Sequence, residues 1–280
     1  MRSVGYLLLV VALLLPLGVY ARKRKKTQQQ EEIFDGFLRQ PDAPMMALRP
    51  QEPLDDDMVL AHQALQQSNH QAAHVVGKSK NKGIDVSHYQ GVINWRDVAK
   101  SGEVSYVYIK ATEGGNLVDN TYRTNLNGAR KAGLRVGVYH FFSPRASVEE
   151  QFRNFTNNVK LKDMDLIPII DVEHIKGVTR EQLCAHLKKF LQKVEKHYGV
   201  EPIIYTSARF YNQNLSKHFS GYKYMIARYH TEVPELTGKV KFVMWQYTCT
   251  GKVRGIKGDV DRSRFMDNYD LQDILLKKKR

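Results

Sequence analysis

The heptapeptide PIIDVEH at residues 168–174 carries the strongest indication of the fold and of its chemistry. Its branched apolar residues predict a buried β-strand that ends in two carboxylic acids. Because side chains alternate along a strand, Asp171 and Glu173 face the same side, with Cα atoms about 6.5–7 Å apart. Burial and mutual repulsion then raise one pKa and leave a protonated acid beside a carboxylate. A strand end that emerges into solvent is the alternative interpretation of this stretch alone.

Similar apolar stretches recur on both sides of this strand, which we place at residues 166–173. They lie at residues 83–89, 105–111, 135–142, 202–206, 223–228 and 241–247, with a weaker one at 258–261. Helices are expected from Trp95, over 120–132, and after the capping boxes that begin at Ser147 and Thr179. Strands alternating with helices favour a parallel α/β sheet. About eight strands, with late connections too short for full helices, predict an incomplete, TIM-like β/α barrel.

The predicted barrel occupies residues 83–272, between an N-terminal extension and a basic tail at 273–280. Residues 3–21 carry no charge and would span about 28 Å as a helix, so residues 1–26 predict a signal peptide cleaved near Ala21 or an uncleaved membrane anchor. Either implies export to the cell envelope, although the basic block 22–26 opposes translocation and leaves the topology open. Residues 27–82 predict a low-complexity linker.

The formal net charge of +14 is concentrated at the termini, because residues 1–26 carry six positive charges and residues 277–280 carry four. Residues 83–276 retain a charge of +7 without a dense basic stripe, so we predict no nucleic-acid partner. Cys184 and Cys249 lack metal-ligand spacing and form either one disulfide or two thiols. We expect no metal, no cofactor and a monomer.

In β/α barrels the chemistry lies at the carboxyl ends of the strands. The polar and aromatic residues there are Asp85, Lys110, Glu113, Tyr139, His140, Asp171, Glu173, Tyr205, Arg228, Trp245, Gln246 and Tyr247. Each has a structural alternative; a histidine beside two phenylalanines, for example, is more often a hydrogen-bonded core residue than a catalyst. Acids that converge with aromatic faces suit carbohydrate cleavage. The chain lacks a phosphate-binding glycine loop and a Ser or Cys nucleophile motif.

Five motifs together resemble glycoside hydrolase family 25, the Chalaropsis-type lysozymes or N-acetylmuramidases. They are GIDVSHYQG (83–91), KATEG (110–114), GVYHFF (137–142), DVE (171–173) and WQY (245–247). The resemblance covers about residues 82–270. It implies a flattened β/α barrel of eight strands with fewer helices. It also implies hydrolysis of the β-1,4 bond between N-acetylmuramic acid and N-acetylglucosamine in the glycan strands of peptidoglycan.

The resemblance also implies roles for individual residues. Glu173 matches the general acid, Asp171 its partner that orients the substrate's acetamido group or stabilises the cationic transition state, and Asp85 a third acid of the cleft. The late aspartate of the family is Asp259 or Asp261, with Asp261 preferred. The chain continues there with Arg262-Ser263 instead of Leu-Asn, so this rim differs from the family pattern. The expected substrate-binding residues are Glu113, Tyr139, His140, Tyr205, Arg228, Trp245, Gln246 and Asp261.

Three other hypotheses explain less of the sequence. A chitinase-like hydrolase would need aspartates where this chain has Leu166 and Ile169. A non-catalytic glycan-binding module on the same barrel would not need the full set of acids. A membrane-tethered scaffold accounts for the basic termini but not for the polar strand ends. Retention or inversion of the anomeric configuration stays open, because sequence spacing does not set the separation of the carboxyl groups.

Overall fold

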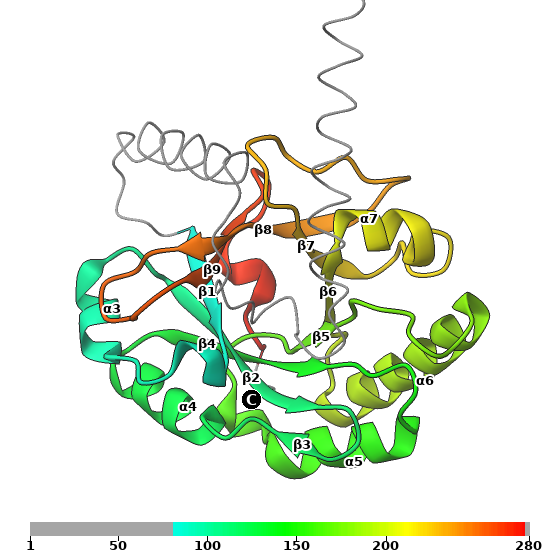
Figure 1. The fold of residues 1–280 in the computed structure, drawn as a ribbon, viewed down its shortest axis with the longest axis horizontal. Coiled ribbons are helices and arrows are strands. Elements are labelled where there is room, and N and C mark those ends of the chain that lie inside the picture. Colours follow the sequence, from blue (N-terminus) through cyan, green and yellow to red (C-terminus); the bar gives the residue numbers. More distant parts are fainter. Residues whose placement is uncertain (1–80, 278–280) are drawn as a thin grey trace, which may run out of the picture. The chain divides into compact units, whose positions relative to one another are not determined.

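The computed structural model describes residues 81–277, so the predictions made for residues 1–80 lie outside the described residues. Nine strands form one sheet (Figure 1). They are β1 (Lys82–Val86), β2 (Tyr106–Glu113), β3 (Leu117–Val118), β4 (Arg135–Phe141), β5 (Ile169–Asp171), β6 (Ile203–Ser207), β7 (Lys223–Ala227), β8 (Lys241–Gly251) and β9 (Val260–Phe265).

Eight of these strands close into a barrel. The order along the sheet is β1-β9-β8-β7-β6-β5-β4-β2-β3, and an additional pairing between β1 and β2 joins the two ends. The short β3 lies outside the ring as a hairpin partner of β2. The predicted incomplete β/α barrel of about eight strands is therefore confirmed.

The strand directions differ from the expected all-parallel sheet. Strand β9 runs antiparallel to both of its neighbours, β1 and β8, while β1, β2 and β4 to β8 pair in parallel. An antiparallel strand can follow its neighbour after a short connection, whereas a parallel one needs a long crossover. The eight residues between β8 and β9, 252–259, are too few for a crossover helix.

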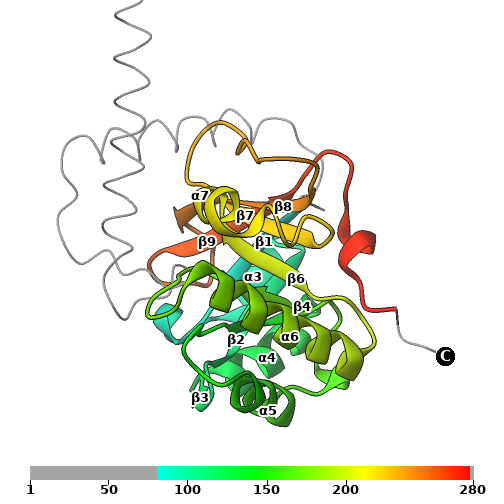
Figure 2. The same cartoon turned by 90° about the vertical axis from the view of Figure 1, so that its right-hand side faces the viewer.

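The helices cover mainly the outside of the early strands (Figures 1 and 2). The α-helices are α3 (Trp95–Ser101), α4 (Tyr122–Lys131), α5 (Val148–Asn158), α6 (Arg180–Tyr198) and α7 (Ala208–Phe210). The shorter helical turns are η2 (His88–Gln90), η3 (Leu161–Asp163), η4 (Tyr211–Leu215) and η5 (Leu271–Ile274). Within the described chain, no α-helix follows residue 215. None of the helices within residues 81–277 combines the length and apolar character needed to span a bilayer.

The two predicted capping boxes have different outcomes. At Thr179 the hydroxyl accepts from the Gln182 N–H and the Gln182 side chain accepts from the Thr179 N–H, so α6 begins as predicted. At Ser147 the side chain makes no capping hydrogen bond, although α5 does begin there. The capping box predicted at Ser147 is therefore wrong, although the helix that it was expected to begin is present.

Two glycines allow large aromatic side chains to fill the barrel. A Cβ atom added at Gly83 or Gly137 would collide with the ring of Tyr106 or Tyr108, respectively. Tyr106 shares a hydrogen bond of 3.0 Å with the Ser263 hydroxyl, and Tyr108 donates to the carbonyl of Ile167 at 3.1 Å. Both tyrosines are fully buried. Their hydroxyl groups are thus satisfied inside the barrel, which is filled by side chains below its mouth.

The described C-terminal residues belong to the barrel domain. Ile274 is fully buried, and its carbonyl accepts from the Ile167 N–H at 2.8 Å. The Leu276 N–H donates to the Asp165 carbonyl at 2.9 Å. The domain thus continues past the predicted boundary at residue 272. Cys184 and Cys249 are both free thiols, which resolves the alternative left open by the sequence.

Candidate active site

The carboxyl groups of Asp171 and Glu173 meet at the end of β5. Asp171 is fully buried and Glu173 is half-buried. Within residues 81–277 no hydrogen-bond donor other than this neighbouring carboxyl reaches the Asp171 oxygens. Burial, the Glu173 charge and the contact with the Glu173 carboxyl raise the pKa of Asp171 well above its usual range. Like charges at neighbouring positions repel, so the Glu173 charge disfavours ionisation of Asp171.

A second pair of acids lies beside the first. Asp85 on β1 and Asp261 on β9 are opposite each other in the antiparallel register, and both side chains are buried. The Gln246 amide donates to both oxygens of Asp85, at 3.0 and 3.1 Å. Burial raises the pKa of Asp85 to about 7, against the opposing effect of the hydrogen bonds from Gln246 and Asp261. Burial and the Asp85 charge raise the pKa of Asp261 well above its usual range.

Tyrosine hydroxyl groups surround these acids. Tyr205 and Tyr229 each donate to the Gln246 side-chain carbonyl at 2.8 Å, which fixes the orientation of the amide toward Asp85. Tyr139 is fully buried, and its hydroxyl has no hydrogen-bond partner among the described residues. Burial, followed by the charges of Asp85 and Asp171, raises the pKa of Tyr139. Tyr139 therefore stays protonated and can donate a hydrogen bond to a bound molecule.

Strand β2 contributes a buried ammonium group. Lys110 is 1% exposed, and its Nζ lies 2.7 Å from Oε2 of Glu113, whose side chain is 32% exposed. The ring of Phe141 lies 5.2 Å below the same ammonium. The Lys110 charge opposes the rise in the pKa of Asp171, so it favours the ionised form of that carboxyl. Glu113 thereby joins the acid cluster through Lys110.

His140 does not lie with the acids, contrary to the sequence-based expectation. Its ring is fully buried between Phe155 and Phe190 on the outer side of β4, with centroid distances of 5.4 and 5.0 Å. Its nitrogens lie 2.8 Å from the Thr112 hydroxyl and 3.3 Å from the Gln151 carbonyl oxygen. Burial lowers the pKa of His140 to about 3. Since Tyr139 points into the barrel, its neighbour His140 must point out of it.

Trp245 and Arg228 also make contacts outside the cluster. The Trp245 indole donates to the Arg228 carbonyl at 2.9 Å, and the Arg264 guanidinium lies 5.0 Å from the indole ring. Trp245 is thus on the opposite face of β8 from Gln246, so its side chain does not join the acids. The Arg228 guanidinium donates to the Val233 carbonyl in the loop after β7.

The structure distinguishes the two late aspartates by position. Asp261 faces the barrel interior, whereas Asp259 forms an ion pair with Lys252 at 2.6 Å. Tyr229 belongs to the cluster but is absent from the residues expected from the sequence, because it follows β7 in a loop. An aromatic residue immediately beyond a polar strand end is the only indication that could have identified it.

The cluster thus offers five carboxyl groups, including that of Glu113, one ammonium group and three tyrosine hydroxyls, positioned by six strands and two loops. Among residues 81–277, no group of three or more His, Cys, Asp and Glu side chains is arranged to hold a metal ion. Paired carboxyl groups with shared protons supply acid catalysis and stabilise a developing positive charge. This is the chemistry of a glycoside hydrolase.

Comparison with known protein families identifies the group to which this chain belongs. Residues 84–256 match the model of glycosyl hydrolases family 25. The chain is therefore a member of this family and a glycoside hydrolase.

Individual relatives agree with that membership. Lysozyme M1 of Streptomyces globisporus is 34% identical over 199 residues, which is 66% of this chain and 67% of that protein. The uncharacterized protein YegX of Escherichia coli K12 is 37% identical over 187 residues, 65% of this chain and 68% of that protein. A solved family 25 glycosyl hydrolase from Bacillus anthracis has a TM-score of 0.62 at 33% identity, with 71% of this chain and 97% of that chain covered.

Proposed function

We propose that the protein hydrolyses the β-1,4 bond between N-acetylmuramic acid and N-acetylglucosamine in peptidoglycan, with Glu173 as general acid and Asp171 as its assisting carboxylate. The observation that carries this proposal is the contact between the Asp171 and Glu173 carboxyl groups at the mouth of the barrel. Two relatives, Lysozyme M1 and the autolytic lysozyme of Clostridium acetobutylicum, support the choice of substrate by their names.

We assign different roles to the two carboxyl groups because they differ in solvent exposure. Glu173 is the more exposed member, so it can reach the glycosidic oxygen and protonate it. The Lys110 ammonium opposes the rise in the pKa of Asp171, and the proposed roles require that the approach of substrate favours a carboxylate at Asp171 and the proton on Glu173. Asp85 and Asp261 hold further negative charge behind the pair, and the free Tyr139 hydroxyl can donate to a sugar oxygen.

The contact between the carboxyl groups limits the possible mechanisms. An inverting pair needs about 6.5–9.5 Å to admit a water molecule, and a retaining pair with a carboxylate nucleophile needs about 5–5.5 Å. Asp171 and Glu173 are separated by one residue, and the Glu173 carboxyl is near enough to raise the pKa of Asp171, so we place both acids on the same side of the substrate bond. We therefore favour attack by the substrate's own acetamido oxygen, with Asp171 accepting from the acetamido N–H, and net retention of configuration.

Two measurements on purified peptidoglycan test the proposal. The wild type should clear a cell-wall suspension and release products that end in N-acetylmuramic acid by mass spectrometry, and Glu173→Gln should clear it about 10²–10⁴-fold more slowly. Products ending in N-acetylglucosamine would contradict the bond assignment. If both proteins bind the wall and neither clears it, the domain is a glycan-binding module. An initially inverted anomer from a defined muropeptide would exclude acetamido participation.

This substrate lies outside the cytoplasm, which agrees with the export predicted from residues 1–26. We propose that the barrel acts in the cell envelope, held by that segment or released from it. N-terminal sequencing of the protein from a membrane fraction and from the surrounding fluid would distinguish the anchored form from one that begins after Ala21.

A further inference from the structure

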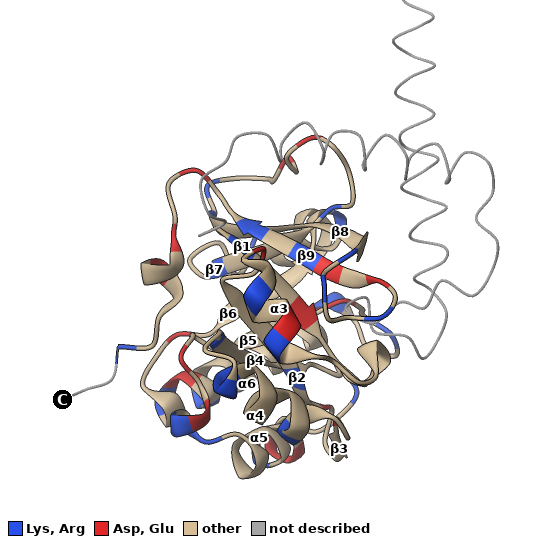
Figure 3. Cartoon of the chain, turned by 90° about the vertical axis from the view of Figure 1, so that its left-hand side faces the viewer, with Lys and Arg blue, Asp and Glu red and all other residues tan. Residues whose placement is uncertain are grey.

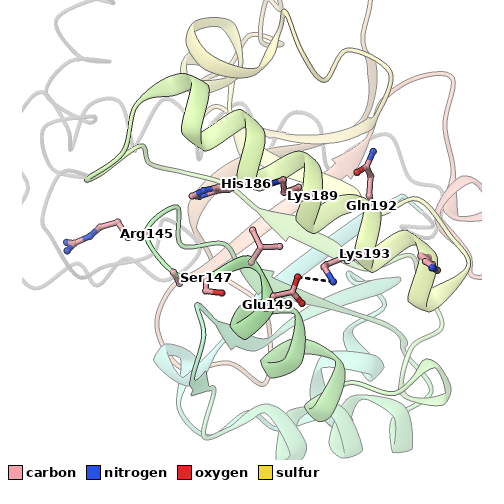
Figure 4. A pocket seen from close by; sticks show the side chains of 10 residues that line it. Arg145, Ser147, Glu149, His186, Lys189, Gln192 and Lys193 are labelled. Atoms are coloured by element: carbon pink, nitrogen blue, oxygen red, sulfur yellow. Dashed lines mark ion pairs between the residues drawn. The ribbon is translucent and has the colours of Figure 1, made fainter.

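A hollow of about 650 Å³ lies outside the barrel mouth, between the loop that follows β4, the first turn of α5 and one side of α6 (Figure 4). Its charged and titratable lining residues are Arg145, Glu149, His186, Lys189, Lys193 and Lys196. The lining thus contains four cationic side chains and a single carboxylate. We call this hollow the basic groove.

The sequence of α6 creates the basic groove. His186, Lys189, Lys193 and Lys196 recur every three or four residues, so they lie on one side of the helix over about 15 Å. Lys193 reaches across to Glu149 at 3.0 Å, and the two side chains are 37% and 63% exposed. At such exposure one ion pair neutralises little of the groove. The groove is therefore a positively charged track along α6.

The basic groove begins beside the loop that carries Glu173. Residues 172–179 connect β5 to α6, and Gly177 in this loop packs against the Arg145 side chain. A Cβ atom at Gly177 would lie 3.0 Å from Arg145 Cγ. His186 Nδ1 lies 3.1 Å from the Pro144 carbonyl and so joins α6 to the loop after β4. Both loops follow barrel strands, so the end of the groove at Arg145 adjoins the loop that carries Glu173.

We propose that the basic groove binds carboxylates of the peptides attached to the glycan strand beside the bond to be cleaved. This inference rests on the proposed peptidoglycan substrate, whose attached peptides carry free carboxylates and amide groups. Arg145 and the lysines can pair with the carboxylates, whereas Ser147 and Gln192 can hydrogen-bond the amides.

The lining favours such a peptide over a uniform polyanion. Glu149 would repel a phosphate polymer, but it can accept from peptide N–H groups. The groove has no Phe, Tyr or Trp on which nucleic-acid bases could stack. On the side of the molecule that presents α3 and β9, basic and acidic residues are interspersed along the chain (Figure 3).

Binding to two forms of one substrate tests this inference. Soluble uncrosslinked glycan chains are prepared with their peptides and after an amidase has removed them. The full-length chain carries Glu173→Gln so that the chains stay intact, and dissociation constants are measured by calorimetry. The groove variant is Lys189→Gln/Lys196→Gln. Its control is Lys131→Gln/Lys188→Gln, which removes the same charge from exposed positions outside the groove.

We expect the groove variant to bind peptide-bearing chains about threefold to tenfold more weakly and stripped chains as before. The control should match its parent on both. Equal weakening on both chains, or no difference between groove variant and control, would overturn the groove assignment. Tighter binding of inorganic polyphosphate than of peptide-bearing chains would also overturn it. Cleavage of stripped chains by the wild type is scored separately, so loss of the groove effect and loss of the proposed hydrolysis are distinguishable.

Discussion

Asp85 and Asp261 face each other across the β1–β9 pairing, with both carboxyl groups buried and in contact. The pKa of Asp85 rises to about 7, and that of Asp261 rises well above its usual range. The pair therefore holds a proton near neutral pH. This lowers the negative charge behind Asp171 and Glu173, so four acids can share one buried site.

The Asp85–Asp261 pair should make stability depend on pH. A carboxyl whose pKa is higher in the folded state stabilises the fold fully below about pH 4, and this contribution is lost as the pH rises toward 7. Asp85→Asn mimics the protonated acid, because its amide can still accept from Gln246 and can donate to Asp261. We expect the variant to gain a few kcal/mol relative to the wild type between pH 4 and 7. Urea unfolding at several pH values measures this gain.

Asp171→Asn should separate catalysis from stability. The new amide can donate to Glu173 and hold it as a carboxylate, so the proton needed for the leaving oxygen is lost. We expect wall clearance to fall at least about 10²-fold, while the melting temperature stays level or rises because a buried charge has been removed. Asp259→Asn, which removes an acid paired with Lys252, is the control and should keep its activity. Equal losses in both variants would contradict the assignment.

Much of the barrel could be predicted because its strands are short apolar runs ended by polar residues. The antiparallel direction of β9 could not be predicted. It pairs with β1, at the other end of the domain, and a pairing between such distant residues leaves no pattern in the local sequence. The expectation that polar residues at strand ends lie close together agrees with the positions of Asp85 and Gln246, whereas Asp261 was expected from the family resemblance. It failed for His140 and Trp245, because consecutive residues of a strand cannot both point inward. Tyr139 and Gln246 occupy the inward positions beside them.

The protonation states of the acids in the cluster are harder still to predict from the sequence. The pKa of Asp85 depends on burial and on an amide oriented by two tyrosine hydroxyls from different elements. Tyr229 joins this hydrogen-bond network from a loop, where the sequence has no periodic pattern from which its position could be predicted. Contacts of this kind arise only when the barrel closes.

Gln246 should be the residue on which the order of the cluster depends. Gln246→Met keeps the volume but removes the hydrogen bonds that the amide makes with the Tyr205 hydroxyl and with Asp85. We expect a loss of about 2–3 kcal/mol in the free energy of unfolding. Urea denaturation should reveal it, with Trp245→Phe as the comparison on the outer face of β8. A neutral effect of Gln246→Met would mean that the network contributes nothing to stability.

His140→Leu tests the corrected position of this histidine. The change leaves Thr112 and Gln151 without their ring partner and should cost about 1–3 kcal/mol. It should leave kcat/KM unchanged at a temperature where the variant is folded. Because the folded pKa of His140 is about 3, its neutral ring stabilises the fold above pH 6.5, and this stabilisation is lost as the pH falls toward 3. The variant should therefore lose less stability in acid. A lower kcat/KM would indicate that His140 contributes to substrate binding or catalysis.

Gly137→Ala tests whether the barrel interior depends on the space that glycine leaves for Tyr108. The added methyl group would overlap the buried ring, whose hydroxyl is tied to the Ile167 carbonyl at 3.1 Å, so neither side can move freely. We expect a loss of about 3 kcal/mol, near the upper end for overpacked cores. Gly221→Ala is the matched control, because no atom lies within 4 Å of its added Cβ, and it should be neutral or gain up to about 1 kcal/mol. Thermal unfolding of both variants measures the difference, and equal melting temperatures would show that Tyr108 can be displaced without cost.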